Sequence, residues 1–205
     1  MAYDATKVVA SRDYKFYTVN WSVNTALPNS NTVPWGNAWG NAGNMTSPWV
    51  ESGYLSGGID FTSAVERTDI RVDQELEPIY RVATARDTRI RTGLAEFSPN
   101  NILAATGQGA VNTVAANVNT KGHSDWDLTS NINTRYLSAG FDLLSPGDSE
   151  AIRGVVYKGQ MLGSFSMPIR PTELVVIPLE LAALPDTSVT PARIATIRDV
   201  IPITA

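Results

Sequence analysis

Residues 65–96 read "VERTDIRVDQELEPIYRVATARDTRIRTGLAE", and the alternation within them decides the fold class. In the first half, charged residues alternate with uncharged ones. The charged face carries Arg67, Asp69, Arg71, Asp73 and Glu75. The opposite face carries Ile70, Val72 and Leu76, with Thr68 and Gln74 as polar exceptions. A period of two is typical of a half-buried strand, so we predict a strand whose apolar residues face the core and whose charges face water.

The second half of this stretch repeats the pattern. Asp87, Arg89 and Arg91 share one face, whereas Ile90 and Leu94 share the other with threonines. Both signs of charge are interleaved, so the wet faces of the two strands can pair with each other. Such a face is either an ordinary solvated sheet surface or the wall of a wide aqueous channel.

A short helix is predicted immediately after these strands, in "FSPNNILAATG" at residues 97–107. Ser98 can accept from the first free amides as the N-cap, and Pro99 suits the first helical position. Gly107 can end the helix in a left-handed conformation. About two turns do not persist in water without packing, so we expect the helix to lie on the sheet.

The rest of the chain predicts further strands separated by long connections. A short strand is expected at Lys15–Val19, and the segments from residue 134 onward read as further strands. Pro-Gly, Lys-Gly (Lys158–Gly159) and Pro-Asp turn signals separate them. Among these segments, "LVVIPLEL" carries Pro178, which favours an edge or bulged strand. We predict one mainly β domain over residues 1–205, an antiparallel sandwich or barrel with eight to ten strands and one short flanking helix. Its irregular parts are an N-terminal arm at 1–20, a loop rich in Trp, Asn and Gly at 21–48, a second connection at 107–133, and a C-terminal arm or strand at 185–205.

Composition excludes several classes of protein. The 205 residues carry a net charge of −4, which does not favour a general nucleic-acid binder. The absence of cysteine excludes disulfides and thiolate chemistry, and a single histidine excludes a site with two imidazoles. No signal peptide and no apolar run of about 18 residues is present. We expect a chain that folds in a cytoplasm and does not insert into a membrane.

Candidate catalytic and metal-binding residues are few. "HSDWD" places His123, Asp125 and Asp127 in an Asn/Thr-rich loop with no second group of ligands in view. The acidic residues after Arg71 lack the glycine and the spacing of an EF-hand loop. Glu51 and Asp60 form a glycosidase pair only in the sense that any two carboxylates could. We therefore predict no catalytic residues, no metal site, no cofactor and no enzymatic activity.

The tryptophans have two interpretations. Trp35 and Trp39 lie in the duplicated "WGNA" of the first long loop, and Trp49 follows it. They either pin the loop to its own domain or contact a neighbouring subunit, because Trp is enriched at the energetic centres of interfaces.

The order of parts in Ser56–Gly107 resembles that of the major tail (tail tube) proteins of long-tailed bacteriophages. Asp73, Gln74, Pro78 and Arg81 form a phrase that joins one strand to the next. A polar strand ending in "LAEF" follows, then the "NILAATG" helix, an Asn/Gly loop and a closing block of strands. This segment covers about a quarter of the chain, and the remainder agrees only in its layout.

The resemblance implies a structural role in a virion. Six copies would form a ring whose inner strands make one continuous β-barrel, and rings would stack into a tube around a tape-measure protein. Double-stranded DNA would pass through that tube, and terminator and baseplate proteins would bind its ends. The chain would then lie in the phage tail, after assembly in the host cytoplasm.

The resemblance and the alternation together give an expected set of residues that face the bore. The set is Arg67, Asp69, Arg71, Asp73, Arg89 and Arg91. The expected contacts between subunits include Trp35, Trp39 and Trp49. Other possible functions are another tail component, such as a terminator or baseplate subunit, and a β-sandwich module that binds carbohydrate or protein.

Overall fold

A computed structural model describes residues 13–21, 49–71, 73, 77–130, 135–144, 151–162, 166 and 174–200. These residues form ten strands and one helix. The strands are β1 (Asp13–Asn20), β2 (Val50–Glu51), β3 (Leu55–Ile70), β4 (Tyr80–Leu94), β5 (Ala110–Val114), β6 (His123–Asp127), β7 (Tyr136–Leu144), β8 (Ala151–Met161), β9 (Ile177–Leu184) and β10 (Ala195–Val200). The helix is α1 (Pro99–Thr106). The prediction of a mainly β, antiparallel sandwich with one short helix is confirmed.

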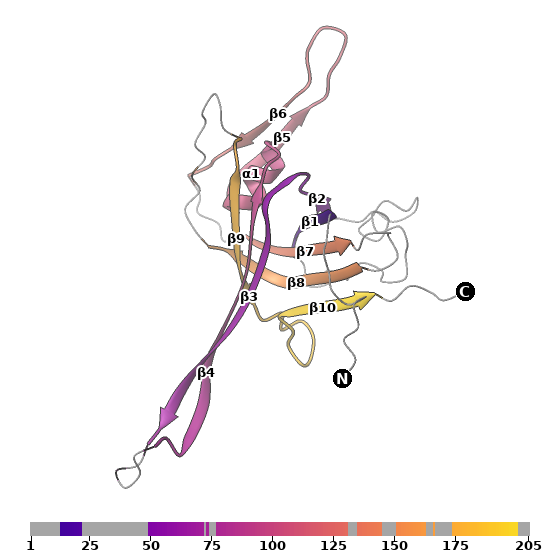
Figure 1. Cartoon of the computed structure of the whole chain (residues 1–205). Helices are drawn as coiled ribbons and strands as arrows, with labels where there is room; N and C mark the ends of the chain where they lie inside the picture. The colour runs from indigo at the N-terminus through magenta and orange to yellow at the C-terminus, as the bar shows by residue number, and fades with distance from the viewer. Residues whose placement is uncertain are drawn as a thin grey trace, which may run out of the picture.

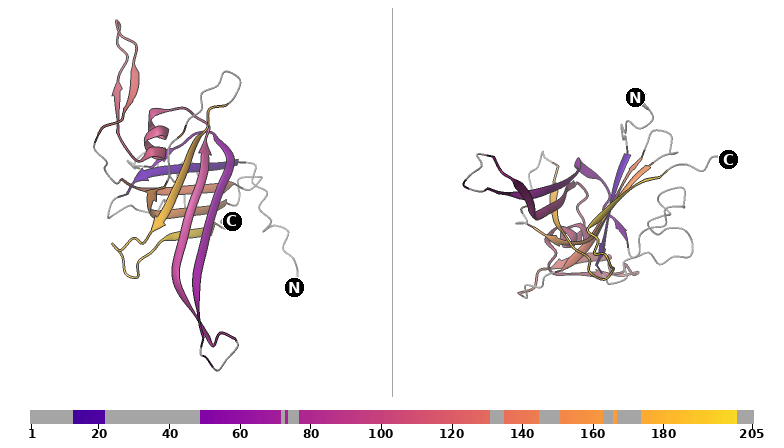
Figure 2. Two further views of the ribbon diagram at one scale, coloured as in Figure 1. Left: turned by 90° about the vertical axis from the view of Figure 1, so that its left-hand side faces the viewer. Right: turned by 90° about the horizontal axis from the view of Figure 1, so that it is seen from below.

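Eight of the strands belong to one sheet that folds over on itself. Its order is β2-β1-β7-β8-β9-β4-β3, and β10 pairs with β8. Strands β1, β7, β8 and β10 form one layer, and β9, β4 and β3 cross it as the second layer (Figures 1 and 2). The C-terminal end of β8 pairs with β9 over Lys158–Met161 and thereby joins the layers.

The main core lies between the two layers. Strand β1 contributes Phe16, strand β7 contributes Phe141 and strand β4 contributes Ile90, all buried. Every second residue of β9 from Ile177 to Leu181 is also buried. Because apolar side chains on alternate positions of both layers meet here, hydrophobic burial holds the layers together.

Helix α1 begins and ends where its sequence predicts. Ser98 is extended, and its hydroxyl accepts from the amide of Asn101 at 3.1 Å. Gly107 has φ 64°, and its amide donates to the carbonyl of Leu103 at 2.9 Å. Ile102, Ala104 and Ala105 are buried in the main core. The packing that a helix of two turns needs therefore comes from the sandwich, one end of which α1 closes.

Two expectations about local structure were wrong. Lys158 and Gly159 do not form a turn, because β8 runs through them between β7 and β9. Residues 107–133 are not a plain connection, because Ala110–Val114 and His123–Asp127 form the β5–β6 hairpin. This hairpin is stabilised by polar cross-strand pairs, such as the hydroxyls of Thr113 and Ser124 at 3.0 Å. Its strands carry no hydrophobic alternation that the sequence could have disclosed.

The expectation that Pro178 marks an edge or bulged strand was wrong for the strand as a whole, because β9 lies between β8 and β4 in the sheet. Among the described residues, Pro178 is opposed only by Gly93 of β4, and the pairing of β9 with β8 starts further along at Leu181. The proline thus lies on a stretch of β9 that has no ladder partner on one side within the described part of the chain, which suits a residue without an N–H.

Two hairpins project from opposite ends of the sandwich (Figures 1 and 2). One is β5–β6, at the end that carries α1. The other is the distal part of β3–β4, described over residues 65–71, 73 and 77–86, which we call the arm. Within the described part of the chain, no helix is long and apolar enough to cross a membrane.

Candidate assembly surfaces

The strand register assigns each residue of the β3–β4 hairpin to one of two faces. Directly opposed residues of antiparallel strands share a face, and successive residues alternate. Ile90 and Thr88 are buried, and their cross-strand partners Phe61, which packs against the core, and Ser63, which is exposed, share their side of the hairpin. Their alternation defines the inner face. Asp60 and Thr62, with Arg91 and Arg89 opposite, define the outer face of the β3–β4–β9 layer.

A bulge at Thr84 resets this alternation inside the arm. Glu66 pairs with Ala85, but the next residue, Arg67, pairs with Ala83, so Thr84 has no opposed residue. Beyond the bulge, Asp69 lies opposite Arg81, and their side chains form an ion pair at 3.0 Å. Both belong to the inner face. Ile70 lies opposite Tyr80 and Val82 opposite Thr68, on the outer face.

The arm is exposed to solvent on both faces. Ile70 is 45% exposed, Tyr80 63% and Val82 36%. The expectation that Ile70 faces the core was therefore wrong. The alternation correctly separates two faces, but it does not show that the strands leave the sandwich before residue 65. Val72 and Leu76 lie outside the described residues.

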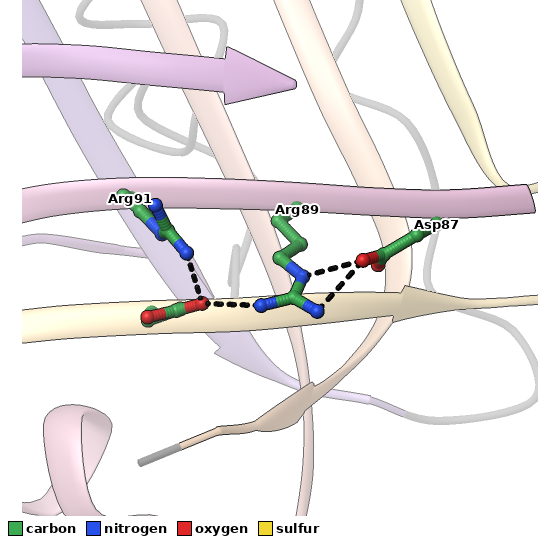
Figure 3. A network of polar contacts seen from close by, with 4 residues as sticks. Asp87, Arg89 and Arg91 are labelled. Carbon is green, nitrogen blue, oxygen red and sulfur yellow. Dashed lines mark hydrogen bonds and ion pairs between the residues drawn. The ribbon is translucent and has the colours of Figure 1, made fainter. Parts of the chain in front are cut away.

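A network of four charged side chains occupies the outer face over the body of the sandwich (Figure 3). Glu180, on β9, accepts through one oxygen from Arg91 at 2.8 Å and from Arg89 at 3.2 Å. Arg89 also donates to Asp87 through Nε at 2.8 Å. Arg91 and Glu180 are direct cross-strand partners, so the register of β4 and β9 fixes this arrangement.

The same contacts shift the pKa values of the two carboxyl groups. The hydrogen bond from Arg89 lowers the pKa of Asp87, and the hydrogen bond from Arg91 lowers the pKa of Glu180. Asp87 in turn raises the pKa of Arg89. All members are at least partly exposed, so solvent screens their attraction and each pair adds little to stability.

The six residues expected to face a bore do not share one face. Arg89 and Arg91 lie on the outer face, whereas Arg67 and Asp69 lie on the inner face of the arm. Arg71 and Asp73 are exposed beyond the last paired residues of β3. Sequence reasoning treated the two strands separately and could not detect the bulge that offsets them.

The first long loop, with Trp35 and Trp39, lies outside the described residues. Trp49 is partly buried and packs within its own chain, against Tyr17, Val155 and Tyr157.

"HSDWD" does not gather a metal site. His123 and Asp125 are 3.5 Å apart on β6, and Asp127 accepts from Asn112 at 2.7 Å. Among the described residues, no three His, Asp or Glu side chains form a group that could hold a metal ion. The two carboxylates considered as a glycosidase pair lie on different strands. Glu51, on β2, forms an ion pair with Lys15 at 3.2 Å, and Asp60 lies on β3.

An open groove lies beside α1, at the end of the sandwich away from the arm. Asn20, Asn100 and Leu103 line both of its adjoining hollows, the larger of about 730 Å³. Arg135 lines both hollows as well and is the one charged residue among the described lining residues. The groove therefore offers a cation and side-chain amides to an acidic segment.

No protein-family model matches the chain, and no curated protein sequence aligns with it significantly. The functional argument therefore rests on the geometry of these surfaces.

Glu180 is the functional candidate that sequence reasoning missed. It lies in the apolar run "LVVIPLELAAL", 89 residues after Arg91. A lone charge within a strand otherwise made of apolar residues was the available signal, since every second residue around it is buried.

Proposed function

We propose that this chain is a structural subunit of a phage tail tube. Six copies form a ring, and rings stack into the tube through which DNA is delivered. The observation that carries the proposal is the arm, a two-stranded ribbon with exposed apolar side chains that extends away from the sandwich.

A projecting two-stranded ribbon with exposed apolar side chains gains stability when it packs against another surface. An isolated two-stranded hairpin is marginally stable in water, and Ile70, Tyr80 and Val82 form an unpaired apolar row along its outer face. Full burial of an exposed apolar side chain of this size releases about 1.5–3 kcal/mol, and these partly exposed side chains would each gain a fraction of that on binding another molecule. The arm therefore supports a subunit that completes its packing by assembly.

The free edge of β3 supports closure into a ring. Among the described residues, β3 pairs only with β4 along its 16 residues. Long unpaired edges are templates for pairing with another chain, and closing a sheet into a barrel removes them. In the proposed ring, neighbouring copies satisfy these edges.

The outer face of the β3–β4–β9 layer would then line the bore. Helix α1 packs into the core on the other side of this layer, so it does not obstruct that face. The bore residues under this proposal are Asp60, Thr62, Asp87, Arg89, Arg91 and Glu180. Arg67 and Asp69 lie on the inner face of the arm and do not share a face with Arg89, so this proposal does not place them in the bore.

Stacking would bring the arm of one copy to the groove of the next. The arm tip is acidic: Arg71 is followed by Asp73, Glu75 and Glu77. Asp73 and Glu77 are exposed, and Arg135 in the groove has the complementary charge. The arm and helix α1 lie at opposite ends of the subunit (Figure 1), and the groove lies beside α1. The contact would therefore repeat head to tail and give an open stack.

A tail tube of this kind would also bind other tail proteins. A tape-measure protein would occupy the bore before DNA passes, and terminator and baseplate proteins would bind the tube ends. The protein would then be located in the virion tail.

Electron microscopy of the purified protein tests this function. The wild-type protein is expected to give rings or hollow tubes. A variant in which residues 67–84 are replaced by Asn-Gly, a two-residue hairpin turn, is expected to keep its β circular dichroism but not form tubes. Discrete monomers of the wild-type protein at all concentrations and salt conditions would overturn the proposal and favour a binding module. Tubes from the shortened variant would show that the arm is not the stacking element.

A further inference from the structure

The two arginines of the outer face are the groups best suited to hold DNA. Arg89 and Arg91 are two residues apart on β4, so they point to the same side about 6.6–6.8 Å apart along the strand. A guanidinium group binds phosphate through paired hydrogen bonds. If both guanidinium groups were free of other partners in every subunit of the proposed tube, the surface of the bore would hold a polyanion such as DNA.

Each of these guanidinium groups is already engaged by a carboxylate. Glu180 bridges both at 2.8 Å and 3.2 Å, and Asp87 contacts Arg89 at 2.7 Å (Figure 3). The four residues together carry no net charge at neutral pH. Arg89 is held by two separate carboxylates, so a phosphate would have to displace both.

We propose that Glu180, with Asp87, masks Arg89 and Arg91 so that the phosphodiester backbone of double-stranded DNA passes this face without being held. The masking gives the proposed bore a specific way to avoid retention, and in that sense it rests on the proposed function. Glu180 acts as a positioning residue, because it acts on DNA only through the arginines that it holds.

Removing the two carboxylate charges should expose the arginines. The double variant E180Q/D87N keeps side chains of nearly the same size and frees both cations. The test measures binding of a fluorescent DNA duplex of mixed sequence to unassembled protein at 50 mM and 200 mM salt. We expect the double variant to bind at least tenfold more tightly than wild type at 50 mM salt. The logarithm of its binding constant should fall with the logarithm of the salt concentration with a slope near −2, since two phosphates are neutralised.

Two further variants separate masking from a change in net charge. D125N/D127N removes the same two charges from β6, on the other hairpin, and is expected to bind DNA as weakly as wild type. Adding R89Q and R91Q to E180Q/D87N restores the wild-type net charge, and that variant should also not bind. Circular dichroism and thermal melting establish that each variant is folded, and the single variants E180Q and D87N provide milder changes if the double variant is not.

Equal binding by E180Q/D87N and D125N/D127N, or no gain over wild type, would overturn the masking. Because this assay uses unassembled protein, its result is independent of tube formation. If the wild-type protein forms tubes but E180Q/D87N gains no DNA binding, only the masking proposal is refuted. If E180Q/D87N gains DNA binding but the wild-type protein forms no tubes, only the proposed tube function is refuted.

Discussion

Asp142 and Arg153 lie directly opposite each other on β7 and β8 and form a fully buried, bidentate ion pair. Arg153 donates through Nε at 2.8 Å to one carboxylate oxygen and through Nη2 at 3.0 Å to the other. Their exposed fractions are 0% and 2%. This pair belongs to the layer that carries β1 and β10, away from the outer face.

Substituting only one member of this pair should be strongly destabilising. In D142N the buried guanidinium of Arg153 loses the charge of the Asp142 carboxylate, so the free energy of unfolding should fall by ~3–5 kcal/mol. Urea unfolding at pH 7 measures the change. The apolar double variant D142L/R153M should recover much of the loss, because neither charge of this pair is then left buried without the other. A loss below ~1 kcal/mol in D142N would show that water reaches the pair.

Gly154 should not tolerate alanine. It lies opposite Phe141, whose ring covers it closely, so an added methyl group would overlap the ring. Phe141 also contacts Phe61 of the second layer, with ring centroids 6.5 Å apart, and therefore cannot move freely. We expect G154A to lose ~1–3 kcal/mol in urea unfolding. The same substitution in an F141L background should cost less, and an equal cost in both backgrounds would contradict the overlap.

Asp186 should make stability depend on acid pH. The Ser188 hydroxyl, at 2.6 Å, lowers its pKa, and Arg193 at 3.3 Å adds to the effect. A carboxyl group with a lowered native pKa stabilises the fold fully above its unfolded pKa of about 3.9, and that contribution is lost as the pH falls through the native value. D186N should therefore be less stable than wild type by ~1–3 kcal/mol at pH 7.

The two proteins should converge in stability as the pH falls below about 4. Urea unfolding at pH 7, 5, 4 and 3 follows the difference between them. A difference that stays constant over this range would mean that the carboxylate charge of Asp186 contributes nothing.

A charge exchange tests the proposed stacking contact. Reversing the groove charge in R135E, or the tip charges in D73K/E77K, should each reduce tube length in electron micrographs, because like charges would then meet. Combining the three substitutions should restore growth. The variant K121E, which reverses an exposed charge on the turn between β5 and β6, serves as the matched control. Normal tubes from R135E would place the arm tip elsewhere.

The sequence predicted the features that depend on neighbouring residues. Ser98, Pro99 and Gly107 set both ends of α1, because capping depends on nearby amides and carbonyls. The period of two predicted the strands of the β3–β4 hairpin for the same reason. The missing N–H of Pro178 did not make β9 an edge strand, because β9 lies between β8 and β4.

Relationships between distant segments were not predictable in this way. The alternation around Ile70 does not tell where the hairpin leaves the core, since that depends on how far the other layer extends. The bulge at Thr84 puts Arg81 on the inner face and Arg89 on the outer face, although both have odd positions in one strand. No glycine or proline at Thr84 indicates this bulge in the sequence. Glu180 meets Arg91 only because β9 pairs with β4, a pairing that spans 89 residues.

Strand β8 has hydrogen-bonded neighbours on both sides over most of its length: β7 on one side, and β10 followed by β9 on the other. Neither layer can open without breaking ladder bonds of this strand. The two layers should therefore unfold as one cooperative unit rather than separately. The amide hydrogens at the centre of β8, around Val155 and Val156, are expected to exchange with solvent only when the whole sandwich unfolds, whereas those of the arm exchange freely in the unassembled subunit.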